Sequence, residues 1–288
     1  MTATLSPRSG PSLAKQVGVV GWVAAGFLAV VVVAAVFAPL VVNHDPNEAN
    51  LLYSFEPSSA THWLGTDATG RDIASRLVYG ARTSLLGPAL IVLLALALSI
   101  PLALISAWCE GWVRALINRA VDIVFAIPGI LLAILTVAVF GAGLRSAVSA
   151  LAVAYLPYTA RVVMSATAAQ ARLPYVDVLT VQGARPRRIM VRHVLRNTAP
   201  LLAGQAAITF AYALIDLAAL SFLGLGVQPP DADWGLMVSD RDALLQGHPQ
   251  QVVVASIAIV ATVMSLLVIG SRLSGEGRPR RFRRRRKG

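Results

Sequence analysis

Five arginines and a regular set of apolar residues share one segment, residues 174–197, which reads PYVDVLTVQGARPRRIMVRHVLRN. The apolar residues recur at helical spacing, and Gly183 divides the segment. Because glycine accepts a positive φ, the pattern predicts two short helices joined by a turn. Such a segment can be the part that a soluble motor protein binds, or an amphipathic loop held at a membrane surface by anionic lipid. The residues alone leave both alternatives open.

A second group of chemistry-bearing residues lies near residue 70, where Asp and Arg alternate with glycines. This composition can build a catalytic cluster, but it also forms a capped turn with Asp–Arg pairing, which contributes little when exposed. We favour the capped turn. We expect this loop, with a tryptophan from a later loop, to shape an outer gate or a docking site for another protein. The residues concerned are Gly65, Asp67, Arg71, Asp72 and Trp234.

Asp216 is the one acidic residue deep inside an apolar run. A carboxylate within a membrane is costly and usually faces a cavity or a partner. Asp216, followed closely by Ser221 and Phe222, is therefore a candidate for a translocation path or for a contact between subunits.

Several kinds of chemistry are excluded by what the chain does not contain. Its two lysines, Lys15 and Lys287, follow no GxxxxG run, so there is no P-loop, and neither a GxSxG elbow nor an HExxH motif occurs. Cys109 is the single cysteine and the four histidines are scattered, which argues against a Cys/His metal cluster. We therefore expect no catalytic residue, no metal and no cofactor bound by this chain.

The elements that must position these residues are membrane-spanning helices. Of the 288 residues, 56% are hydrophobic and 14% charged, and the mean hydropathy is +0.68. The apolar runs are near the roughly 20 residues that cross a bilayer, so the sequence predicts an all-α polytopic membrane protein with six transmembrane helices. Arg161 interrupts the fourth run, which makes this span the weakest, and its side chain can extend to the membrane surface if it lies near the end of the span. The predicted spans are residues 17–42, 83–107, 123–144, 146–165, 198–222 and 252–271.

Basic residues set the predicted orientation. With the N-terminus inside, the inner segments carry 20 Lys and Arg and the outer segments carry 5. The positive-inside rule therefore places both termini in the cytoplasm. The basic tail, which ends in RPRRFRRRRKG, is expected to bind the anionic membrane surface rather than nucleic acid. The predicted parts are an inner tail (1–16), the first span (17–42), an outer loop (43–82), a core (83–271) with the inner segment 174–197 and the outer loop 224–251, and the basic tail (272–288).

Four stretches resemble the dipeptide/oligopeptide/nickel permease family of ABC transporters. The segment 174–197 is similar to the EAA loop of these permeases: Asp177 begins the EAA positions, Gly183 takes the glycine, and residues 193–197 match an RHxLPN ending with Arg196 in place of proline. The others are HWLGTDATGRDIASRLVYGARTSL at 62–85, VDIVFAIPGILLAI within 119–134, and SFLGLGVQPPDADWGLM at 221–237. The last points to the C-type subunit.

The resemblance implies the type I ABC importer permease fold and a non-enzymatic role as a transmembrane subunit for peptide import in a bacterial inner or plasma membrane. The implied partners are a homologous B-type permease subunit, two nucleotide-binding ATPase domains that hold ATP and Mg, an extracytoplasmic substrate-binding protein and membrane lipid. The resemblance assigns coupling to the ATPase to seven residues of the loop: Tyr175, Asp177, Gly183, Arg188, His193, Leu195 and Asn197.

Other functions stay open at this point. Relatives in the same family carry nickel or other small cargo. An ion-coupled carrier or channel usually places several ionisable groups in the membrane, whereas Asp216 is the only clear one here. A membrane-anchored scaffold would bring no ATPase with it.

Overall fold

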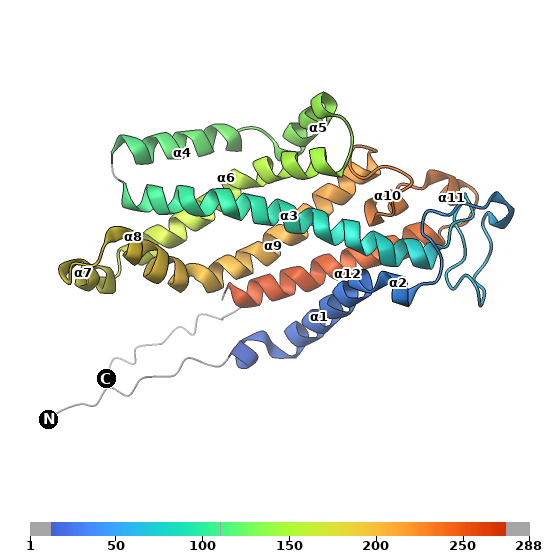
Figure 1. Cartoon of the computed structure of the whole chain (residues 1–288), viewed down its shortest axis with the longest axis horizontal. Coiled ribbons are helices and arrows are strands. Elements are labelled where there is room, and N and C mark those ends of the chain that lie inside the picture. The colour runs from blue at the N-terminus through green and yellow to red at the C-terminus, as the bar shows by residue number, and fades with distance from the viewer. Residues whose placement is uncertain (1–12, 110, 275–288) are drawn as a thin grey trace, which may run out of the picture.

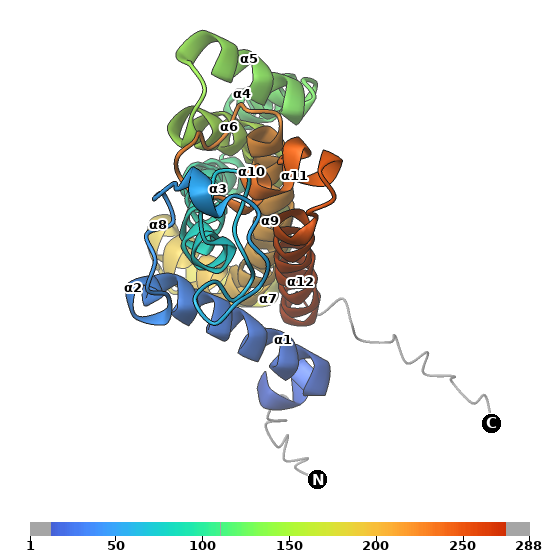
Figure 2. The ribbon, with the colours of Figure 1, turned by 90° about the vertical axis from the view of Figure 1, so that its right-hand side faces the viewer.

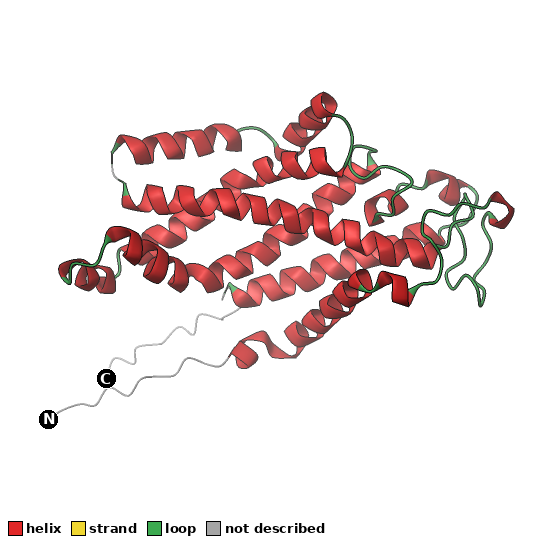
Figure 3. Ribbon diagram, in the orientation of Figure 1, coloured by secondary structure: helices red, strands yellow, loops and turns green. Residues whose placement is uncertain are grey.

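The computed structural model describes residues 13–109 and 111–274, and this part of the chain consists of helices and loops without a β-strand (Figures 1 and 3). The predictions for residues 1–12 and for most of the arginine-rich tail lie outside the described residues. Five described helices are long and apolar enough to cross a membrane, or six when a bent pair counts as one span. They are α1 (Leu13–Val36), α3 (Ile73–Trp108), α6 (Leu144–Ala171), α9 (Leu195–Phe222) and α12 (Gln250–Leu273), with α4 (Trp112–Phe125) and α5 (Gly129–Phe140) as the bent pair.

The helix α3 begins at Ile73, well before the predicted start of the second span at residue 83. Asp72 caps it, because its Oδ2 accepts a hydrogen bond from the Ser75 N–H at 2.7 Å. Residues 73–82, which the sequence analysis placed in the outer loop, are therefore helical. The rest of that loop contains only the short helix η1 (Leu51–Tyr53), while the short helix α2 (Ala38–Val41) lies at the end of the predicted first span.

The third predicted span is broken. Where the sequence predicted one straight helix over 123–144, α4 and α5 meet at 78°. The break falls at Ile127 and Pro128, because proline has no N–H to donate and disfavours helical geometry in the residue before it. The first half of this span, α4, also starts earlier than expected, at Trp112.

Packing centres on α3, which contacts α6, α9, α4 and α1. The largest buried cluster brings together Ile91 of α3, Ala133 of α5, Leu151 of α6 and Leu217 of α9, with several further alanines. Small side chains of this kind allow membrane helices to approach closely. On one side of the bundle, α1 lies against α12 and α3 (Figure 2).

The bundle has two distinct ends (Figure 1). The loop 43–72 and the short helices α10 (Trp234–Val238) and α11 (Arg241–Leu245) form one end, which we call the cap end. The other bears α7 (Pro174–Val181) and α8 (Pro186–Arg188), and we call it the α7 end. The start of α1 and the end of α12 are directed toward the α7 end.

Candidate functional site

The segment 174–197, a candidate for binding a motor protein, is a helix–turn–helix at the α7 end, as expected (Figure 1). After α7 the chain turns at Gly183, and α8 leads through a π-helical turn, Ile189–Val194, into α9. Gly183 has a φ of 77°, and a Cβ added there would meet nothing within 4 Å. The backbone conformation therefore requires the glycine, whereas the surrounding space does not. The sequence analysis did not indicate the π-helical turn.

One face of α7 is anchored to the bundle. Val176 is buried in a cluster with Ile189, Met190 and Val194. Side chains from the last turns of α3 pack on the same cluster. Because packed clusters deform little, α7 is held as one unit with the end of α3 and with the π-helical turn that leads into α9.

The other face of α7 is apolar and exposed. Val178 is 54% exposed and Val181 is 89% exposed. Neighbouring exposed apolar side chains on a short helix beyond the end of a bundle are the mark of a contact surface.

The seven residues assigned to coupling separate into two groups. Tyr175 and His193 are partly buried, and Leu195 packs inside the bundle against α3 and α6, so its side chain supports α9 and does not face outward. Four are exposed at the α7 end: Asp177, Gly183, Arg188 and Asn197. Asp177 lies in the first turn of α7, where the helix dipole favours a negative charge.

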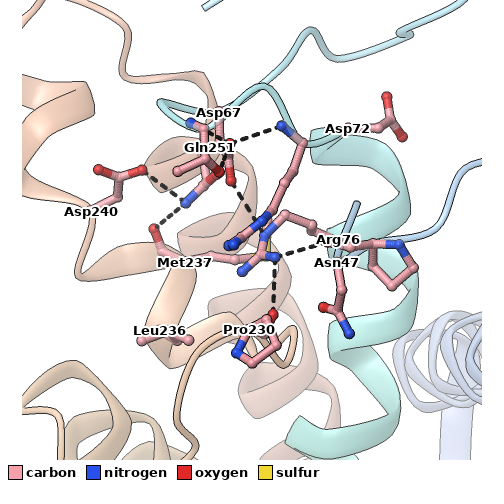
Figure 4. Close-up of polar contacts among 12 residues, drawn as sticks. Asn47, Asp67, Asp72, Arg76, Pro230, Leu236, Met237, Asp240 and Gln251 are labelled. Carbon is pink, nitrogen blue, oxygen red and sulfur yellow. Dashed lines mark hydrogen bonds and ion pairs between the residues drawn. The ribbon is translucent and has the colours of Figure 1, made fainter. Parts of the chain in front are cut away.

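At the cap end, Arg76 ties the two outer loops to α3 (Figure 4). Its side chain is 3% exposed, and one Nη donates to the carbonyl oxygens of Pro46 at 2.9 Å and Pro230 at 3.3 Å. Its Nε lies 3.7 Å from Oδ2 of Asp67. One guanidinium therefore holds backbone from both loops against the first turn of α3.

The predicted Asp–Arg pairing exists, but it is buried and joins Asp67 with Arg76 rather than with Arg71. The other carboxylate oxygen of Asp67 accepts from the N–H and Oγ1 of Thr69 at 2.8 and 2.7 Å and from the N–H of Arg71 at 3.0 Å. This buried aspartate organises the loop. It offers no exposed carboxylate to a partner.

Two further gate candidates also shape the cap from within. Asp72 caps α3 and contacts Nδ1 of His62 at 3.1 Å. Gly65 has a φ of 77°, and a Cβ there would lie 2.4 Å from the carbonyl oxygen of Glu56. The loop can therefore close only with glycine at this position.

Trp234, the last gate candidate, is 2% exposed and locks α10 onto α3. Its indole N–H donates to the carbonyl of Leu77 at 2.9 Å, and its backbone N–H donates to Oγ of Ser84 at 3.0 Å. Ser84 in turn donates to Oδ2 of Asp233 at 2.7 Å. Burial raises the pKa of the Asp233 carboxyl above its ordinary value, while the hydrogen bond from Ser84 opposes that rise. Because its side chain is buried, Trp234 cannot contact a docked protein directly in this conformation.

Inside the bundle, Asp216 of α9 accepts a hydrogen bond from the hydroxyl of Tyr155 on α6 at 2.7 Å. Both side chains are partly buried. Tyr158 and Tyr212, one turn away on the same two helices, are 39% and 49% exposed. The carboxylate thus lies beside a polar, tyrosine-rich surface of the isolated chain.

The other two path candidates differ from Asp216. Ser221 is fully buried, and its Oγ accepts from the backbone N–H of Val227 at 3.2 Å, so it stabilises the turn after α9. Phe222 is exposed at the end of that helix. Of the three, only Asp216 combines a polar partner with an open side.

Sequence reasoning did not single out Arg76, Ser84, Asp233 or Tyr155. The first three lie in the quoted motif stretches, but spacing does not show which of several polar residues point inward. Tyr155 becomes significant only once α6 and α9 cross beside it. Among the described residues, no group of three or more His, Cys, Asp or Glu is placed to hold a metal ion.

The polytopic bundle and its helix–turn–helix define a transporter subunit of the importer class. Residues 99–275 match the family described as binding-protein-dependent transport system inner membrane component, and the chain belongs to this family of ABC transporter permeases. It is therefore a multi-pass membrane subunit of a system that depends on a binding protein, and ATP hydrolysis resides on other subunits of such systems.

Particular relatives agree with the predicted family. The chain is 38% identical to the dipeptide transport system permease protein DppC of Alkalihalophilus pseudofirmus, over 83% of this chain and 79% of that one. It is 35% identical to the glutathione transport system permease protein GsiD of Pectobacterium atrosepticum, over 87% and 84%. A chain of the inward-facing MetNI methionine ABC transporter superposes with a TM-score of 0.58 at 19% identity, over 70% of this chain and 95% of that one. This likeness confirms the predicted importer permease fold.

Proposed function

We propose that this chain is the C-type transmembrane subunit of an ATP-driven importer for short peptides, paired with a homologous B-type permease subunit in a bacterial inner membrane. The relatives support the cargo class, because their names specify dipeptide, di/tripeptide and glutathione transport. All of these are short peptides. Nickel and other small cargo are the alternatives within the family.

The observation that carries the proposal is the two-sided construction of α7. Its exposed valine face is suited to the surface of a nucleotide-binding domain, and its buried face packs on the end of α3 and on the π-helical turn that leads into α9. When two such domains close on ATP and Mg, a helix held in one of them must follow. The movement then passes directly into two helices of the bundle and biases it between inward-open and outward-open states.

Asp216 supports a path or subunit contact beside α6 and α9. A partly exposed carboxylate and neighbouring exposed tyrosines are poorly suited to lipid tails. They are well suited to a water-filled path or to the partner permease. Asp216 and Tyr155 would then line the part of the path that this subunit contributes.

The charge distribution supports the orientation. The α7 end carries most of the arginines near the spans, and the positive-inside rule favours the cytoplasmic side for such an end. The cap end then faces outward, where the substrate-binding protein delivers its cargo. The buried cap residues would shape this surface from below, and the exposed loop positions above them would meet the binding protein.

The proposal is tested by Gly183→Trp in the reconstituted transporter. The substitution adds a bulky group to the exposed turn beside α7, and we expect peptide uptake and substrate-stimulated ATPase to fall roughly tenfold or more, as for a loss of about 1.4 kcal/mol in docking. Gly141→Trp is the matched control, because Gly141 also has a positive φ, 89°, with nothing within 4 Å of an added Cβ, but it follows α5, which lies far from α7 (Figure 1). Wild-type uptake and ATPase in the Gly183 variant would refute the coupling role. Inhibition of uptake by vanadate, but not by an uncoupler, separates this function from that of an ion-coupled carrier.

A further inference from the structure

A polar cavity of about 510 Å³ lies between α3, α4 and α6 toward the α7 end. The described residues that line it include three arginines and one acid: Arg114, Arg161, Arg172 and Asp122. Asn118 and Ser165 add uncharged polar groups. Three guanidinium groups around one cavity repel each other unless negative charge is present to compensate them.

The deepest arginine is already compensated within the chain. One Nη of Arg161 lies 2.6 Å from Oδ1 of Asp122, and the guanidinium stacks over the ring of Phe125 at 4.1 Å from its centroid. Arg161 thus forms an ion pair that joins α6 to α4. This pair uses the single carboxylate among the described residues that line the cavity.

The other two arginines lie nearer the end of the bundle. Arg114 is oriented by its Nε, which donates to the carbonyl of Ser106 at 2.8 Å, and its terminal amino groups engage no described residue. Arg172 is the C-cap residue of α6, and its guanidinium group too has no polar partner among the described residues. Two guanidinium groups are thus available to an anion at the mouth of the cavity.

The residues around the mouth of the cavity indicate its depth in the membrane. Trp108 ends α3 and Trp112 begins α4, and both are exposed. Tryptophan is enriched where hydrocarbon meets lipid headgroups. Beyond them, Leu116 and Ile123 are exposed apolar side chains of α4 that can contact acyl chains. A phosphate at the cavity mouth would therefore lie at headgroup depth, with hydrocarbon contacts beside it.

We propose that this cavity binds the phosphate of an anionic phospholipid from the leaflet on the α7 side, with Arg114 and Arg172 as its ligands. Guanidinium groups suit phosphate because they donate paired N–H groups in a planar fork. The bound headgroup would bridge α4 to α6 just ahead of α7. A free phosphate ion offers the same oxygens, so the test must distinguish the two sources.

The experiment measures bound phosphatidylglycerol on the purified transporter by native mass spectrometry, with phosphatidylcholine as the reference lipid. We expect Arg114→Gln and Arg172→Gln each to weaken phosphatidylglycerol binding roughly tenfold, as for the loss of one charge-assisted contact. The matched control is Arg119→Gln, because Arg119 is exposed on α4 and does not line the cavity. A second variant, Ala168→Phe, fills the cavity without changing its charge and should weaken binding in the same way.

Equal phosphatidylglycerol binding by the wild type, the arginine variants and the filled-cavity variant would overturn the proposal. So would inorganic phosphate that binds with the same arginine dependence when phosphatidylglycerol does not. Loss of phosphatidylglycerol in the cavity variants, with retention in the Arg119 variant, supports it. None of these outcomes depends on transport activity, so the result stands apart from the test of coupling.

Discussion

Replacing Arg76 by methionine should open the cap end while leaving the membrane-spanning bundle folded. The side chain makes two charge-assisted hydrogen bonds, to the carbonyls of Pro46 and Pro230, at 2.9 and 3.3 Å. Such bonds contribute about 1.5–3 kcal/mol each, and the longer one shares its donor with the shorter. We therefore expect a loss of about 3 kcal/mol in the free energy that holds the cap closed. Since each 1.4 kcal/mol is a factor of ten, the open cap should become roughly 100-fold more populated.

Hydrogen–deuterium exchange measures this population directly. Amides in the segments 43–72 and 224–238 should exchange much faster in Arg76→Met, while those in the centre of α6 and α9 should not change. Arg241→Met is the control, because Arg241 lies at the same end but is exposed. Unchanged exchange in both outer segments would show that Arg76 does not join them, and the reasoning from its buried contacts would be wrong.

Three further predictions concern other parts of the molecule. Val181→Asp should lower substrate-stimulated ATPase severalfold but shift thermal stability little, since the side chain is 89% exposed; an equal loss of stability in a melting assay would contradict this. Burial in the folded state raises the pKa of Asp233, so the folded state binds the carboxyl proton more tightly than the unfolded state does. The contribution of Asp233 to stability should therefore decline as the pH rises above 3.8, the ordinary pKa of the carboxyl. Melting temperatures of the wild type and Asp233→Asn across pH should therefore diverge in favour of the variant toward neutral pH, and parallel curves would contradict the assignment. Pro128→Ala should reduce the 78° bend, which spin-label distances between positions 116 and 135 would report as an increase.

The sequence could predict those parts of the fold that depend on local patterns. Apolar runs of membrane-spanning length predicted the spans, and the glycine between two apolar stretches predicted the turn at Gly183. The start of α3 was predicted too late, because hydropathy locates the apolar part of a helix and says nothing of its capped polar first turns. The break before Pro128 was missed for a related reason: prolines occur in several spans, and α3 contains two without a break in its helix. Whether neighbouring helices compensate for a proline is decided by tertiary packing.

The candidate site was predicted in the same uneven way. Segment 174–197 is continuous, so its helices and turn follow from local sequence. The cap depends on partners far apart in the chain: Arg76 contacts Pro230, and Ser84 contacts Asp233. No local pattern pairs these residues, so the burial of Trp234, a candidate for the gate or docking site, could be seen only in the fold.

The buried guanidinium of Arg76 also determines how this protein can be recombined with its relatives. Its contacts reach residue 46 on one side and residue 230 on the other, so the two outer loops and the start of α3 form one interlocked block. A chimera that exchanges a single outer loop would place foreign backbone against the native arginine. Exchange of residues 43–84 together with 224–251 keeps Arg76 with Pro46 and Pro230, and Ser84 with Asp233. A chimera that gains specificity for a different substrate-binding protein should therefore function when the whole block is exchanged and fail when one loop is exchanged alone.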